Sequence, residues 1–107
     1  MKGTEKQIRF AESIIAEAEE TIRRNIETNQ ERYEKTHYQG YADFIAQWKA
    51  TAVVYRKKLE RYGDDAERII LNRNMIGSEA VVDIWNDIGM KLQLGKITRE
   101  QLEEFAK

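Results

Sequence analysis

Residues 4–26 have the sequence TEKQIRFAESIIAEAEETIRRNI, and residues 41–62 have the sequence YADFIAQWKATAVVYRKKLERY. In both stretches apolar residues recur at alternating spacings of three and four. The first series is Ile8, Ala11, Ile15, Ala18 and Ile22, and the second is Tyr41, Ile45, Trp48, Ala52, Tyr55, Leu59 and Tyr62. This alternation repeats every 3.5 residues, the period of helices that pack along one another. No proline interrupts either stretch, so the sequence predicts two long helices.

Capping and breaking residues mark the ends of the first predicted helix. Thr4 and Gln7 have the spacing of a capping box, in which each side chain satisfies a backbone N–H of the other residue. The first helix is therefore predicted over residues 4–35. A break is expected at residues 36–40, because Gly40 costs about 1 kcal/mol in a helix interior. A single continuous helix through these residues is the alternative.

Shorter helices are expected after the second long helix. The second helix is predicted over residues 41–62, ending at Gly63, because glycine easily adopts the left-handed closing conformation. The residues that would open the next three helices are Asp64 or Asp65, then Ser78 with Glu79, then Thr98 in a capping box with Gln101. The apolar residues of these helices are Ala66, Ile69 and Ile70; Val81, Ile84, Trp85 and Ile88; and Leu102 and Phe105.

Small residues on the two long helices favour a hairpin. Ala11 and Ala18 on the first helix and Ala52 on the second would let the two backbones approach closely. Bulky residues such as Trp48 and Tyr55 need small neighbours opposite them to fill space without overpacking. The same two apolar series could instead join two chains as a homodimer, and the sequence does not separate these arrangements.

Length and composition favour a single helical domain. The chain has 107 residues, of which 35% are charged, a balance that suits long helices with solvated outer faces. We therefore expect an all-α fold of four or five helices, led by a long antiparallel hairpin. The sequence contains no cysteine, which excludes disulfides and thiol catalysis. No apolar segment approaches the ~20 residues that cross a bilayer, and no secretion signal follows Met1, so we expect a cytoplasmic protein.

Aromatic residues form the densest group of potential contact residues. Between positions 33 and 62 they are Tyr33, Tyr38, Tyr41, Phe44, Trp48, Tyr55 and Tyr62. Such residues on a helix can stack on bases or anchor a partner protein. Four of them are seven residues apart and share the apolar series, so we interpret them as core: Tyr41, Trp48, Tyr55 and Tyr62. The other three are predicted to contact a partner: Tyr33, Tyr38 and Phe44.

The second long helix also carries the strongest local charge bias. Its charged residues from position 49 onward are Lys49, Arg56, Lys57, Lys58, Glu60 and Arg61. Five basic residues against one acidic residue can form a phosphate-binding face. We favour a solvated face paired with acidic residues of the first helix, because the net charge of the whole chain is −1. The residues of this face predicted to contact a macromolecule are Arg56, Lys57 and Arg61, with nucleic-acid binding as the alternative function.

Two motifs with potential for chemistry have simpler explanations. Glu34 and His37 have the Glu-x-x-His spacing of di-iron carboxylate bundles, but such sites need two of these motifs, and His37 is the single histidine. Asp83 and Asp87 are one helical turn apart, as paired carboxylates are in some hydrolases, but we expect them on the solvated side of their helix. We therefore predict a non-enzymatic protein with no catalytic residue, no metal and no cofactor.

The stretch Thr4–Ile14, TEKQIRFAESI, resembles a helical element of the form T-E-K-Q-I-x-F/W-A-E-x-I that recurs in small proteins of phages and mobile elements. The resemblance covers about a tenth of the chain and includes no catalytic residue. It implies an accessory protein that binds and blocks a host or defence protein in the bacterial cytoplasm, as anti-CRISPR inhibitors do. The predicted function is thus that of a helical interaction protein.

Overall fold

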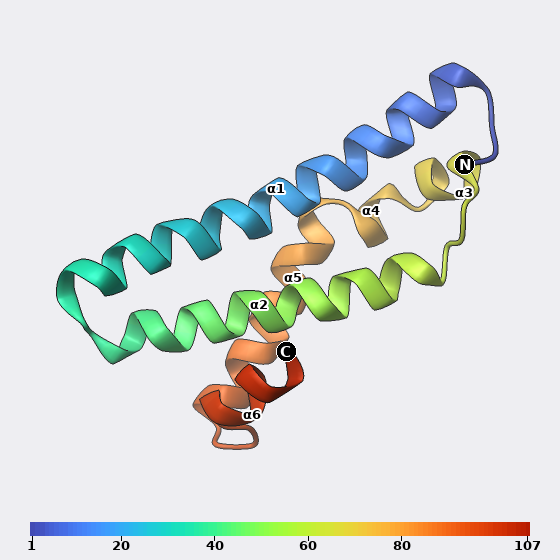
Figure 1. Cartoon of the computed structure of the whole chain (residues 1–107). Helices are drawn as coiled ribbons and strands as arrows, with labels where there is room; N and C mark the ends of the chain where they lie inside the picture. Colours follow the sequence, from blue (N-terminus) through green and yellow to red (C-terminus); the bar gives the residue numbers. More distant parts are fainter.

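A computed structural model describes residues 1–107 and contains six helices and no strand (Figure 1). The helices are α1 (Glu5–Thr36), α2 (Gln39–Glu60), α3 (Ala66–Leu71), α4 (Arg73–Ile76), α5 (Ser78–Gln93) and α6 (Arg99–Phe105). The all-α fold is confirmed, and α1 and α2 form the expected long antiparallel hairpin. The number of helices is six rather than the expected four or five, because Arg73–Ile76 forms a separate short helix. The molecule is elongated, with principal extents of 48 × 28 × 21 Å. None of its helices is apolar over a length that would cross a lipid bilayer.

Local side-chain bonds begin three of the helices where the sequence predicts them. The Thr4 hydroxyl accepts from the Gln7 N–H at 3.1 Å, and the Gln7 side chain accepts from the Thr4 N–H at 2.9 Å. Thr98 and Gln101 form the same capping box before α6, at 3.2 and 2.9 Å. Asp65 caps α3 by accepting from the backbone of the next turn. These bonds satisfy N–H groups that a helix start leaves unpaired, so each start is determined locally.

The turn between α1 and α2 breaks the chain as expected, but at a different residue. His37 closes α1 in the left-handed conformation, with φ of 53°, and Tyr38 is extended. Gly40 lies inside the first turn of α2, so the prediction that this glycine causes the break was wrong. Glycine is needed at this position because of a close contact: a Cβ atom on Gly40 would collide with the Tyr38 ring. The glycine makes room for this ring above the start of α2.

The two apolar series meet in the centre of the hairpin. Ala18 and Ile22 of α1 pack with Trp48 and Tyr55 of α2, and Val81 of α5 completes this cluster. All five side chains are buried. The apolar series are therefore packed against each other within one chain, with α5 as a third element.

The remaining core surrounds α2. A second cluster, at the open end of the hairpin, joins α1 to the short helices and contains Ala11, Ala66, Ile69 and Ile76. A third cluster joins α2 to α5 and α6 and contains Ala46, Ala50, Ile88 and Leu102. Two faces of α2 are therefore buried, and its apolar series predicts the face that packs against α1. The second face, which contains Ala46 and Ala50, was not predicted from the sequence.

Candidate functional site

A groove of about 740 Å³ lies between the first half of α2 and the second half of α5. It is lined by Gly40, Asp43, Phe44, Gln47, Trp85, Asn86, Gly89, Met90, Leu92 and Gln93. Asp43 is the single charged residue in this lining, although 35% of the chain is charged. Its carboxylate is paired with Arg99 of α6 at 3.4 Å. The α2–α5 groove is therefore an almost uncharged surface on a highly charged molecule.

Aromatic rings form the wall of the α2–α5 groove. The ring of Phe44 lies 6.2 Å from that of Trp85, which stacks on Trp48 at 5.4 Å between centroids. Trp48 is buried, so it supports the half-buried Trp85 ring from the core side. Phe44 is 41% exposed and Met90 is 61% exposed, which makes them the accessible apolar side chains of the groove.

A buried amide determines how closely α5 crosses α2. The Gln47 side chain is 3% exposed, and its Nε2 donates to the Trp85 carbonyl at 2.8 Å. A Cβ atom on Gly89 would lie 2.5 Å from this nitrogen. Because Gln47 is buried and bonded, it has little freedom to move away, so the absence of a side chain at Gly89 permits the crossing. This contact forms the floor of the groove.

The three aromatic residues predicted to contact a partner do not share one surface. Phe44 lines the α2–α5 groove, whereas Tyr33 of α1 is half-buried in another groove, of about 550 Å³, which α2 and α6 also line. Tyr38 is 65% exposed at the hairpin turn, where its ring meets that of Tyr41 edge-on. The structure thus brings Phe44 together with Trp85, while Tyr33 and Tyr38 lie apart from that pair.

The three basic residues predicted to contact a macromolecule lie in the second half of α2. Arg56, Lys57 and Arg61 are exposed, and the ammonium of Lys57 lies 5.0 Å from the centre of the Phe105 ring. The expected pairing of this face with acidic residues of α1 is not formed. Instead, Arg23 of α1 binds two of those carboxylates within its own helix. The basic residues of this face consequently have no carboxylate as an ion-pair partner.

The candidate metal and acid–base residues are scattered on the surface. His37 is exposed, and its ring meets Tyr33 edge-on at 5.7 Å. Asp83 is exposed, and Asp87 is paired with Lys91 at 3.1 Å. No three histidine, aspartate or glutamate side chains are grouped closely enough to hold a metal ion. The α2–α5 groove is the candidate functional site because of its aromatic and almost uncharged lining, which suits binding.

Sequence reasoning missed most of this groove. Trp85 was predicted as one of the apolar residues of its helix, and it is half-buried because one side of the ring packs on Trp48. Asn86 and Met90 were not singled out, although residues 84–90, IWNDIGM, contain a single charged residue. That low charge, on a helix expected to have a solvated side, was the available signal.

The chain matches no known protein family, and no curated protein or solved structure is significantly similar to it. The resemblance of Thr4–Ile14 to phage and mobile-element proteins therefore stays a prediction. In the structure this segment forms the cap and the first turns of α1. Arguments about function rest on the surfaces described above.

Proposed function

We propose that this chain is a non-enzymatic interaction protein that binds a segment of a partner protein in the α2–α5 groove. The observation that carries the proposal is the composition of the groove, which combines Phe44, Trp85 and Met90 with one paired charge. The buried centres of protein interfaces are enriched in aromatic residues and methionine and depleted in lysine and glutamate. Large side chains in such pockets contribute most of the binding energy.

The lining residues define the chemistry of the partner segment. Trp85 and Phe44 offer flat apolar surfaces for a large apolar side chain, and Met90 can adapt its shape to that side chain. The amides of Asn86 and Gln93 can both donate and accept, which suits main-chain groups of a peptide. A charged residue at the centre of the segment would lose its hydration without finding an opposite charge.

The resemblance of Thr4–Ile14 to proteins of phages and mobile elements supports a partner from the host or its defence systems. Binding would then block that partner in the bacterial cytoplasm, without any reaction catalysed by this chain. The groove supplies the contact surface, and the bond from Gln47 to the Trp85 carbonyl links its two walls.

Affinity capture with matched variants tests this proposal. Met90 and Leu94 are similarly exposed, at 61% and 63%, but Met90 lines the groove and Leu94 does not. We expect Met90→Glu to weaken capture of the partner from a bacterial lysate about tenfold or more, because it places a charge against the apolar segment. Leu94→Glu should capture the same protein as the wild type. Equal capture by both variants, with unchanged helical circular dichroism, would refute the groove as the site.

Nucleic-acid binding by the basic face is a second candidate. The favouring observation is that Lys49, Arg56, Lys57 and Arg61 have no carboxylate partner. Phosphate contacts would make binding to a mixed DNA and RNA pool fall steeply with salt. Retention of the pool at low salt that is abolished by Arg56→Glu with Lys57→Glu would favour this candidate, and no retention at low salt would exclude it.

A further inference from the structure

The hairpin has a second apolar groove on the side that the shorter helices leave open. This groove, of about 420 Å³, lies between α1 and α2, and no residue of α3, α4, α5 or α6 lines it. Its apolar residues are Ala16, Ile22, Ile26, Ala52 and Tyr55. In Figure 1, α4 and the first turns of α5 lie behind the hairpin. The α1–α2 groove shares no lining residue with the α2–α5 groove.

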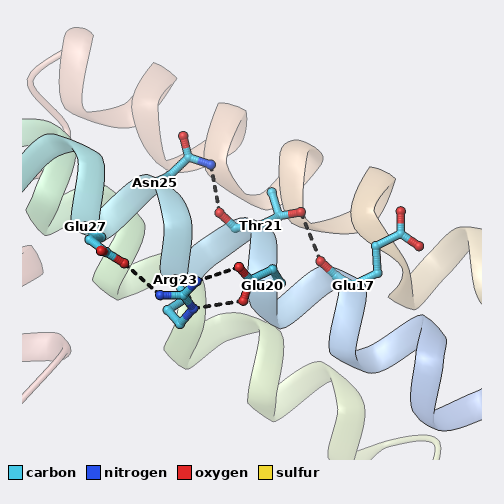
Figure 2. Close-up of polar contacts among 6 residues, drawn as sticks. All are labelled: Glu17, Glu20, Thr21, Arg23, Asn25 and Glu27. Atoms are coloured by element: carbon cyan, nitrogen blue, oxygen red, sulfur yellow. Dashed lines mark hydrogen bonds and ion pairs between the residues drawn. The ribbon is translucent and has the colours of Figure 1, made fainter.

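The α1 edge of this groove is acidic. Figure 2 shows Arg23 between Glu20 and Glu27, with Thr21 and Asn25 on another side of the helix. Arg23 donates to Glu20 at 2.6 and 2.8 Å and to Glu27 at 2.7 Å. The bond from Arg23 holds the pKa of Glu20 below its usual range. Of the three charged residues of α1 that line the groove, Glu20 is paired with Arg23, and Glu19 has no ion pair.

The α2 edge of the groove is basic. Arg56 lines it, is exposed, and makes no ion pair with the Glu19 carboxylate across the groove. Arg56 is the single charged residue of α2 in the lining of this groove. The two edges therefore have opposite charge, and each has one residue without an ion pair: Glu19 on the α1 edge and Arg56 on the α2 edge.

We propose that the α1–α2 groove is the interface of a homodimer, in which a second copy is related by a two-fold axis parallel to the hairpin. This rotation places α1 of each copy over α2 of the other, so the acidic edge of one meets the basic edge of the other. The axis runs along the helices, so residues at the same level face each other. Glu19 of each copy then pairs with Arg56 of the other, and the pair occurs twice.

The charge pattern favours a two-fold axis along the helices over a two-fold axis that runs across them in the same plane. A two-fold axis across the helices would place α1 over α1 and set the carboxylates of Glu19 and Glu20 against their own copies. Like charges facing each other in an interface are unfavourable and suppress that arrangement. With the parallel axis, Ala16 and Ala52 allow the helices of the two copies to approach, and the apolar floors merge into a four-helix arrangement.

Sedimentation equilibrium with charge-reversed variants tests the homodimer. We expect the wild type to dimerise in a concentration-dependent way, with weaker association at high salt. Arg56→Glu and Glu19→Arg should each be monomeric, because the dimer of either variant would contain two like-charged pairs. An equimolar mixture of the two variants should restore a dimer, since the introduced arginine of one variant then meets the introduced glutamate of the other. Lys96→Glu, an exposed charge reversal outside the groove, should dimerise like the wild type.

Three results would overturn the homodimer. They are a wild type that stays monomeric up to about 1 mM, the range of weak association; single variants that still dimerise; and a mixture that does not restore the dimer. Circular dichroism of each variant verifies that the helices are retained, which is expected because both positions are exposed. The experiment needs no partner protein, so its outcome is independent of the proposed function of the α2–α5 groove.

Discussion

Tyr55 shows how a single side chain links distant parts of the fold. It is 2% exposed, and its hydroxyl donates to the Ile76 carbonyl at 2.5 Å, which joins α2 to α4. Burial raises the pKa of this phenol to about 12, and the nearby charge of Glu19 adds to the shift. The side chain is therefore held in its neutral, hydrogen-bonded form.

Replacing Tyr55 with phenylalanine should lower the free energy of unfolding by about 1–2 kcal/mol. The variant removes the donor and leaves the Ile76 carbonyl buried without this partner. Urea denaturation at neutral pH measures the change. Tyr38→Phe is the matched control, because its ring is 65% exposed, and we expect it to match the wild type. Equal stability of the wild type and Tyr55→Phe would contradict the role of this bond.

The raised pKa of Tyr55 predicts that the stability difference between the wild type and Tyr55→Phe depends on pH. The unfolded chain releases the Tyr55 proton near pH 10, whereas the folded chain retains it to about pH 12. The stabilising contribution of this group is therefore complete below pH 10 and is lost as the pH rises towards 12. The stability difference between the wild type and Tyr55→Phe should shrink over that interval. A difference that stays constant would show that the phenol is not held neutral.

At the scale of elements, the short helix α6 depends on its cap and its contacts. Arg99–Phe105 is too short to be stable alone in water. Thr98 and Gln101 close its first turn, while Arg99 donates to Gln39 of α2 at 2.7 Å. The cap therefore contributes to the stability of the α2–α6 contact as well as to the helix.

Thr98→Ala should lower the free energy of unfolding by about 1 kcal/mol, because it removes the acceptor for the Gln101 N–H. Gln101→Ala should have a smaller effect, since it removes the return bond alone. The two bonds form one unit, so the double variant should lose less than the sum of the single losses. Thermal unfolding of the three variants measures this, and strictly additive losses would contradict a shared capping box.

On the scale of the whole molecule, α2 is the element that all three hydrophobic clusters border. Trp48 and Tyr55 belong to the cluster shared with α1, Ala46 and Ala50 to the cluster shared with α5 and α6, and Leu59 packs against the cluster at the open end. Because one helix connects the clusters, unfolding of one should be coupled to unfolding of the others.

Leu102→Ala should consequently destabilise the whole domain. Leu102 is 6% exposed in the cluster with Ala46 and Ala50, so its truncation should cost about 2–4 kcal/mol. We expect a single cooperative transition at a lower temperature, measured by calorimetry. Leu94→Ala, at a position that is 63% exposed, should leave the transition nearly unchanged. A separate early transition in Leu102→Ala would show that α6 unfolds independently.

The sequence alone determined the all-α character and five of the six helices, but it left open whether the first two helices pair within one chain. Thr4 with Gln7 and Thr98 with Gln101 were predictable because a cap involves neighbours within one turn. Gly63 adopts its expected left-handed conformation, with φ of 66°, for the same local reason. The break between the first two helices was wrongly attributed to Gly40, because this glycine is needed for its contact with the Tyr38 ring.

The tertiary structure alone decided which faces of the helices are free. The periodicity of apolar residues indicates that one side of a helix is buried, but it does not indicate which element covers that side. The α2–α5 groove joins Phe44 to Trp85 and Met90 from a separate helix, through a close crossing at Gln47 and Gly89. The opposite charges of the α1–α2 groove likewise depend on how the hairpin sets Glu19 beside Arg56. Contacts between residues so distant in sequence arise only when the chain is packed, because no local bond encodes them.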